Sequence, residues 1–154
     1  MDLCDLLAPD SIISSLEASS KKHALQELAT IAAERTGLDS REIFNMLLQR
    51  ERLGSTGLGR GIAVPHVKLP KLDTIVCLFA RLDEPVDYDS HDNEPVDLLF
   101  LLLAPEHASG DHLKALASIS RVVREPSTID ALRNASDTAG LHLALTVAAP
   151  SHAA

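Results

Sequence analysis

The chain has 154 residues, of which 45% are hydrophobic and 23% are charged, a composition typical of a globular domain with one continuous core. Its formal net charge of -8 and its aromatic content of 3% argue against a nucleic-acid partner, because nucleic-acid-binding surfaces need clustered Lys and Arg and stacking rings. The longest apolar run, residues 98–104, is far shorter than the ~20 residues of a membrane-spanning helix, so we expect no membrane insertion.

The N-terminus and the cysteines indicate the compartment. The first ten residues are rich in acid and lack the basic region and the long apolar stretch of a secretory signal, which predicts a cytoplasmic protein. Cys4 and Cys77 are far apart in the sequence and form no C-x-x-C pair, so we expect two free thiols.

Two helices are predicted in the first third of the chain. The first spans residues 20–36, with Ser19 or Ser20 as N-cap and Gly37 as the stop, and its buried stripe consists of Leu25, Leu28, Ile31 and Ala32. The second begins at Asp39, which forms a capping-box pattern with Glu42, and ends near Arg52. Its buried stripe consists of Ile43, Phe44, Leu47 and Leu48.

Strands are predicted in the middle of the chain. They cover residues 62–67, 74–82, 86–88 and 96–104, and the segments "LDEP" and "DSHDNEP" between them have the composition of turns. Helical spacing returns after Pro105, at Leu113, Leu116, Ile119 and Val123, and Pro126 fits the first turn of another helix. Residues 141–147 alternate like a strand but follow N-cap residues, and we interpret them as a helix.

This order of elements predicts an α/β fold in which a central mixed β-sheet is flanked by helices in three layers. We expect a single domain over residues 1–148 and a flexible C-terminal tail over residues 149–154.

A glycine-rich segment, "GSTGLGRGIAVPHVKL" from Gly54 to Leu69, is the main candidate for function. A Walker loop needs Lys and Ser or Thr after its second glycine, where Arg60 and Gly61 stand. The dinucleotide fingerprint needs a third glycine where Ile62 stands. Neither phosphate-binding motif is present.

The segment instead leads to His66. Pro65 fixes its own φ and favours an extended Val64, while the upstream glycines let another molecule approach the backbone closely. A neutral imidazole held in this way has one free nitrogen lone pair and can act as a nucleophile toward a phosphoryl group. The same residues also fit a loop histidine that merely ends a strand.

Three stretches, "QRERLGSTGLGRGIAVPHVKL", "DNEPVDLLFLLLAP" and "HLKAL", resemble the mannitol/fructose-type (type 2) enzyme IIA (EIIA) domains of the bacterial phosphoenolpyruvate-dependent phosphotransferase system (PTS), and in particular its nitrogen-regulatory branch. The resemblance implies the EIIA fold and a phosphoryl group accepted by His66, at Nε2, from an HPr-like phosphocarrier protein. It also implies that Arg50 and His112 are the other active-site residues. No cofactor or metal is implied.

Arg50 and His112 also make physical sense in these roles. Arg50 lies near the end of a predicted helix, where its planar guanidinium could pair with phosphoryl oxygens. His112 lies in the first turn of a predicted helix, where the helix dipole disfavours imidazolium and favours an anion. From the residues alone, Arg50 is equally a solvated helix arginine and His112 a surface histidine.

Two positions depart from the family pattern. Val67 is β-branched where the family usually has a small residue, which could crowd the carrier's approach. Arg60 stands where the family often has an uncharged residue, so it is either an additional phosphate donor or an exposed charge. We expect Ser55 and Thr56 to cap backbone amides in the loop, with contact to a phosphoryl oxygen as the alternative.

A metal site is not expected. Glu106, His107, Asp111 and His112 are close in sequence, but they cross a predicted loop-helix boundary without a standard ligand spacing.

The resemblance therefore implies a phosphohistidine carrier of the nitrogen-regulatory PTS, a phosphoryl-transfer component whose role is mainly regulatory. The partners that it implies are an HPr-like carrier and regulatory targets such as sensor kinases or potassium transport proteins. Two alternatives are open: a sugar-specific EIIA component that passes its phosphoryl group to an EIIB domain, and a binding module that carries no phosphate.

Overall fold

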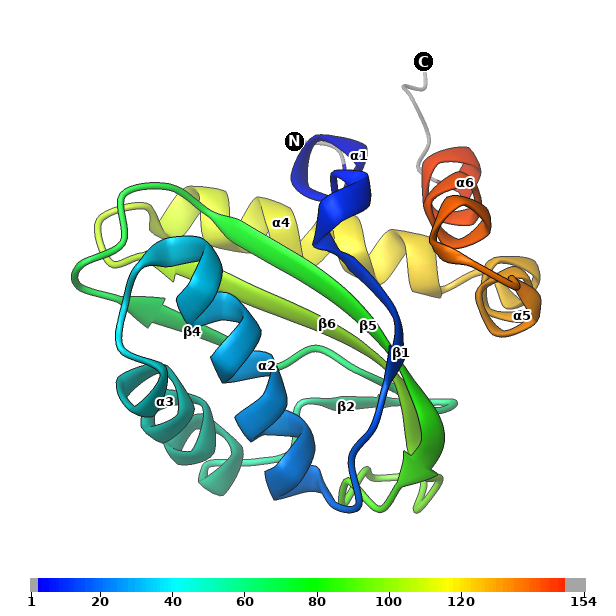
Figure 1. Cartoon of the computed structure of the whole chain (residues 1–154), viewed down its shortest axis with the longest axis horizontal. Coiled ribbons are helices and arrows are strands. Elements are labelled where there is room, and N and C mark those ends of the chain that lie inside the picture. The colour runs from blue at the N-terminus through cyan, green and yellow to red at the C-terminus, as the bar shows by residue number, and fades with distance from the viewer. Residues whose placement is uncertain (1–2, 149–154) are drawn as a thin grey trace.

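The computed structural model describes residues 3–148. In this range a six-stranded mixed sheet lies between two layers of helices, as Figure 1 shows. Helices α2 (Lys21–Thr36) and α3 (Ser40–Arg52) cover one face, and α4 (Ser109–Val123) covers the other together with the smaller helices. The predicted three-layer α/β fold is confirmed. The tail predicted over residues 149–154 lies outside the described residues.

The remaining helices are shorter than α2, α3 and α4, and the strands form the sheet. The helices are α1 (Leu3–Leu6), η1 (Pro9–Ser11), α5 (Pro126–Asn134) and α6 (Thr138–Ala148), and the strands are β1 (Ile12–Leu16), β2 (Gly57–Gly59), β3 (Ile62–Ala63), β4 (His66–Leu69), β5 (Val76–Val86) and β6 (Val96–Pro105). None of the helices in the described part of the chain has the length and apolar character needed to cross a bilayer.

The predicted helix boundaries are confirmed by their caps. Ser20 is the N-cap of α2 and accepts a hydrogen bond from the backbone N–H of His23, and Gly37 ends this helix with a φ of 78°. The Asp39 side chain caps α3 by accepting from the N–H of Arg41. Residues 141–147 lie in α6, so the choice of helix over strand is also confirmed.

The sheet has the order β1-β5-β6-β3-β2, and β4 pairs with β6 beyond β3. Strands β5 and β6 are antiparallel, while β1 pairs with β5, and β3 and β4 pair with β6, in parallel. The prediction of a turn at residues 82–85 was wrong: β5 continues to Val86, and the register shift between Arg81 and Val86 absorbs the proline there. The short edge strands β1 and β2 were not predicted.

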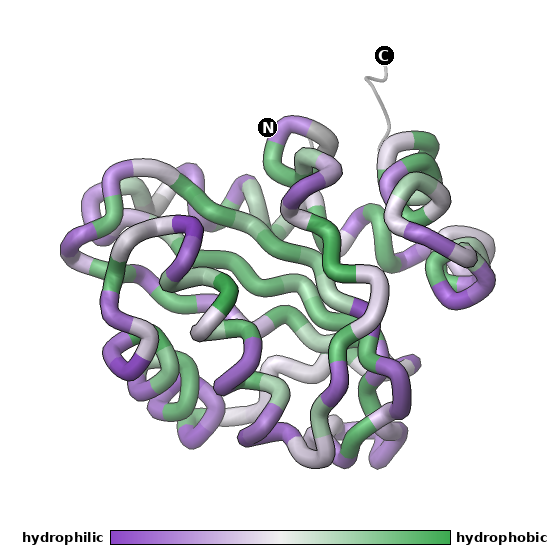
Figure 2. The backbone as a smooth tube through the Cα atoms, in the orientation of Figure 1, coloured by the Kyte–Doolittle hydropathy of each residue, from purple (hydrophilic) through white to green (hydrophobic). Residues whose placement is uncertain are grey.

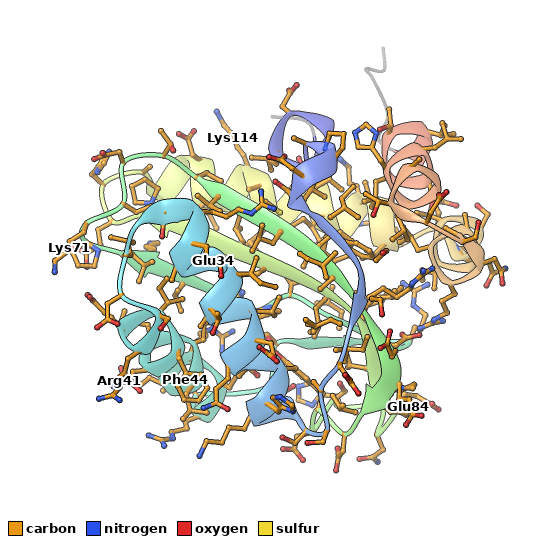
Figure 3. The ribbon with its side chains drawn as sticks, in the orientation of Figure 1. Glu34, Arg41, Phe44, Lys71, Glu84 and Lys114 are labelled. Carbon is orange, nitrogen blue, oxygen red and sulfur yellow. The ribbon has the colours of Figure 1, made fainter. Side chains whose placement is uncertain are left out.

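Strand β6 divides the core between the two faces. Leu99, Leu101 and Leu103 pack in the cluster beneath α2 and α3, while the residues between them pack in the cluster beneath α4. The strands are accordingly the most continuously hydrophobic part of the chain (Figure 2). Charged side chains such as Arg41, Lys71 and Glu84 project from the periphery (Figure 3).

The strand predicted over residues 62–67 is two strands. β3 ends at Ala63 and β4 begins at His66, and both pair with β6 in one continuous register. Pro65 causes the break because it has no N–H to donate to a sheet ladder, although its carbonyl still accepts from Leu102. His66 therefore begins a strand rather than ending one.

Cys77 is a free, fully buried thiol, and burial raises its pKa to about 12. The side chain of Cys4 lies outside the described part of the structure.

Candidate functional site

His66 lies on the α4 side of the sheet with its ring fixed by one backbone contact. Its Nδ1 is 2.7 Å from the carbonyl oxygen of Val64. A carbonyl can only accept, so Nδ1 carries the proton and donates it, which leaves Nε2 with a free lone pair. The ring is half-buried, and this tautomer is the one that a nucleophile at Nε2 requires.

His112, from α4, is brought beside His66. The two ring centroids are 5.4 Å apart, and the ring planes meet at 73°. Only 7% of His112 is exposed, so its interpretation as a surface histidine is wrong. Its Nε2 is buried without a hydrogen-bond partner among the described residues. A buried polar atom without a hydrogen bond lowers the stability of the fold. Such atoms occur at functional sites, where a ligand can supply the missing partner.

Arg50, near the end of α3, is the third predicted site residue. It lines a cavity of about 150 Å³ together with His66. One guanidinium N–H, on Nη1, donates to the carbonyl of Gly54 at 2.8 Å, which holds the side chain against the loop. The other residues lining the cavity are Ser55, Thr56, Gly57, Leu58, Val64, Leu116 and Ser120.

Both imidazoles favour the neutral form. Burial lowers the pKa of His66 below its ordinary value of 6.5, with a further lowering by the positive charge of Arg50, against the opposing effects of the Val64 hydrogen bond and the Glu51 charge. Burial likewise lowers the pKa of His112, helped by the charges of His66 and Lys68. At neutral pH the site therefore presents two uncharged rings.

This geometry predicts a pH dependence. We expect proton NMR titrations of the His66 and His112 rings to have midpoints below 6.5, whereas the same histidines in the urea-unfolded chain titrate near 6.5. Because the unfolded state then binds protons first as the pH falls, the free energy of unfolding should decrease as the pH is lowered from 7 through this window. Midpoints at or above 6.5 for both rings would contradict the burial of the site.

The two departures from the family pattern have structural explanations. Val67 is 7% exposed and packs in the core beneath α2 and α3, so it points to the face of the sheet opposite His66 and does not crowd the cavity. Arg60 has a φ of 57° and donates to the carbonyls of Val123 and Arg124 at the C-terminal end of α4. It therefore caps a helix instead of standing as a free charge or facing the histidines.

The loop before His66 is held by polar contacts. Ser55 Oγ donates to the carbonyl of Tyr88 and accepts from the N–H of Gly57, both at 3.1 Å, in agreement with the capping interpretation. Thr56 differs from the capping prediction, because it is buried and its hydroxyl donates to the Glu51 carboxylate instead. Sequence reasoning missed Glu51, together with Tyr88 and Lys21. Three stretches distant in sequence, around Lys21, residues 51–56 and Tyr88, meet in this network, so no local pattern could have revealed it.

The acidic and histidine residues after β6 do not converge. Glu106, His107 and Asp111 are exposed, whereas His112 is buried beside His66. In the part of the chain that the structure describes, no group of three or more His, Cys, Asp or Glu side chains is arranged to hold a metal ion.

Comparison with known proteins gives a consistent result. Residues 5–146 match the model of the family described as "Phosphoenolpyruvate-dependent sugar phosphotransferase system, EIIA 2". A nitrogen regulatory protein of Bradyrhizobium diazoefficiens is 53% identical over 147 residues, covering 96% of each chain. A fructose-specific EIIABC component of Bacillus subtilis is 33% identical over 124 residues, which cover 80% of this chain and 20% of that protein.

Among solved structures, the crystal structure of nitrogen regulatory protein IIA-Ntr from Neisseria meningitidis superposes with a TM-score of 0.88 at 33% identity. The match covers 93% of this chain and 98% of that one.

Proposed function

Because the chain belongs to the EIIA type 2 family of the phosphoenolpyruvate-dependent sugar phosphotransferase system, we propose that it is a phosphohistidine carrier that accepts a phosphoryl group on Nε2 of His66. The single observation that carries this proposal is the hydrogen bond from Nδ1 of His66 to the Val64 carbonyl, which leaves the Nε2 lone pair free. The donor is an HPr-like phosphocarrier protein of the nitrogen branch.

The transfer follows from this tautomer. The Nε2 lone pair of His66 forms a bond to phosphorus as the phosphorus–nitrogen bond of the donor histidine breaks, and the donor ring leaves with that electron pair. The His66 ring then carries Nδ1–H and a formal positive charge. The Val64 carbonyl accepts from this N–H and stabilises the charged ring, while the phosphoryl group stays activated for onward transfer.

His112 and Arg50 stabilise the phosphoryl oxygens. In the neutral tautomer that carries its proton on Nε2, His112 donates a hydrogen bond from this buried atom. The atom has no partner among the described residues. Arg50 has one guanidinium N–H bonded to Gly54, which leaves the planar fork oriented along the cavity that His66 shares. Such preorganised donors act where negative charge is concentrated during transfer.

Regulation is the proposed output, exerted in the cytoplasm on targets such as sensor kinases or potassium transport proteins. The phosphoryl group brings about -1.5 to -2 charge, which the positive His66 ring partly offsets, and so changes which partners this face can bind. Three leucines are strongly exposed at or near the site, Leu53 at 86%, Leu58 at 51% and Leu113 at 69%. Exposed apolar groups around a reactive side chain support protein docking here. The 53% identity to a nitrogen regulatory protein supports this branch.

A sugar-specific EIIA component is the second candidate, supported by the 33% identity to a fructose-specific EIIABC protein. It would pass the phosphoryl group from His66 to an EIIB domain. The remaining alternative is a module that never carries phosphate. Its best argument was crowding by Val67, and the burial of that side chain on the opposite face weakens that argument.

The test is intact-protein mass spectrometry at alkaline pH, which preserves phosphohistidine. The protein is incubated with phosphoenolpyruvate, enzyme I and a nitrogen-branch or a sugar-branch carrier, and the labelled protein is then mixed with an EIIB domain. We expect one phosphoryl mass increment, faster loading from the nitrogen-branch carrier, and no rapid loss to EIIB. Rapid transfer to EIIB would favour sugar uptake, and no increment with either active carrier would overturn the proposal.

A further inference from the structure

A buried carboxylate lies directly beneath the loop that leads to His66. The Glu51 side chain is 3% exposed, and its Oε1 accepts from the N–H of Thr56 at 3.0 Å and pairs with Lys21 Nζ at 3.0 Å. Its Oε2 accepts from the hydroxyls of Thr56 and Tyr88, the latter at 3.3 Å. One carboxylate thus joins the first turn of α2, the end of α3, the glycine-rich loop and the segment after β5.

Stability is a poor explanation for this arrangement. Desolvating two charges costs several kcal/mol per ion, and a buried ion pair is often no more stabilising than apolar residues of similar volume. Lys21 gains a second contact, because its Nζ lies 4.5 Å above the centre of the Tyr88 ring, yet the same place could hold an apolar cluster. The hydrogen bonds of the network fix the orientation of the groups that they join, which an apolar cluster does not do.

A series of hydrogen bonds connects Glu51 to His66. Thr56 is held at both its N–H and its hydroxyl by Glu51, and its carbonyl accepts from the N–H of Val64 at 3.0 Å. The carbonyl of Val64 in turn accepts from Nδ1 of His66 at 2.7 Å. The path from carboxylate to imidazole is therefore a continuous series of hydrogen bonds through Thr56 and Val64, at the point where Pro65 interrupts the sheet.

We propose that Glu51 is a positioning residue that acts through Thr56 and Val64 to hold the His66 ring in the Nδ1–H tautomer with Nε2 free toward the cavity. Lys21 is its counter-ion, at 3.0 Å from Oε1. The inference rests on the proposed function only in taking the oriented ring as the phosphoryl acceptor, since the orientation itself belongs to the unphosphorylated protein. The negative charge of Glu51 also acts on His66 directly, opposing that of Arg50.

The main test variant is the double substitution Lys21→Met with Glu51→Leu, which replaces the ion pair by apolar side chains of similar size. It removes the acceptors of Thr56 without leaving the partly buried Lys21 unpaired. We expect a folded protein in which two-dimensional proton–nitrogen NMR of His66 shows a mixture of tautomers. The rate constant of phosphoryl transfer should fall about 10- to 100-fold, as when a group that orients a reactive side chain is lost.

Two further substitutions complete the design. Glu51→Gln keeps one oxygen for the Thr56 N–H, so its rate constant of phosphoryl transfer should lie between those of the wild type and the double variant. Asp97→Asn is the control, because Asp97 forms a more exposed pair with Arg133 at 2.9 Å, and this pair bonds the loop only at the Arg60 carbonyl rather than at Thr56 or Val64. It should leave the tautomer and the transfer rate unchanged.

If the double variant does not fold, Thr56→Val and Thr56→Ser replace it. The valine lacks the hydroxyl that bonds Glu51 and should lower the transfer rate about threefold, and the serine should restore it. An unchanged Nδ1–H tautomer in a folded double variant, or in Thr56→Val, overturns the positioning role whatever the rate does. The tautomer is measured without any donor, so failure of wild-type labelling would count against the proposed function alone.

Discussion

Replacement of His66 by alanine is expected to abolish phosphoryl labelling completely, because the ring supplies the atom to which phosphorus bonds. The fold should survive, since the side chain is half-buried and its hydrogen bond is to a backbone carbonyl that water can satisfy instead. The measurement is intact mass at alkaline pH after incubation with phosphoenolpyruvate, enzyme I and the carrier, with circular dichroism as the check on folding.

His66→Gln is the second variant, because it keeps a polar side chain of similar reach without a nucleophilic lone pair. Both variants should lack the increment while the wild type carries one. An increment that persists in folded His66→Ala would mean that another histidine, with His112 the nearest, is the acceptor. Peptide mapping of that product would then identify it.

The layers of the fold were predictable because the hydrophobic periodicity of long, regular segments can be recognised in the sequence. The caps Ser20, Gly37 and Asp39 mark helices by local chemistry, and the continuous apolar run of β6 follows from burial on both faces. Strands β1 and β2 could not be found in this way. They are short edge strands whose existence depends on partners, β5 for the first and β3 for the second, that lie far away or across a tight turn.

The site was predictable in its residues and not in its contacts. The resemblance of the loop pointed to His66, Arg50 and His112, and the structure brings all three to one place. The burial of His112 was missed because a histidine early in a helix reads as exposed until the facing strand is known.

The roles of Glu51 and Val67 were invisible for a related reason. Glu51 lies among charged residues near the end of a helix, where a solvated side chain is expected. Only the convergence of Lys21, Thr56 and Tyr88 buries it. Val67 was a concern in sequence because its direction was unknown, whereas strand alternation turns it to the face opposite His66.

Replacement of His112 by alanine is the second large effect that we expect. It removes a proposed hydrogen-bond donor beside the His66 ring, and loss of one preorganised donor to a charged transition state typically slows a reaction about 10²- to 10³-fold. Labelling should still reach completion with time, because the nucleophile is intact. The rate is measured by rapid quenching with radiolabelled phosphorylated carrier, with the carrier concentration varied.

The concentration dependence separates a donor role from a docking role. A group that acts only in the transition state lowers the maximal rate with little change in the carrier concentration giving half-maximal rate. His112→Gln, whose amide N–H can reach in the same direction, should recover part of the loss. A normal maximal rate with weaker carrier binding in His112→Ala would instead assign His112 to the docking surface that includes the neighbouring exposed Leu113. His66 and Arg50 would then have to carry the chemistry alone.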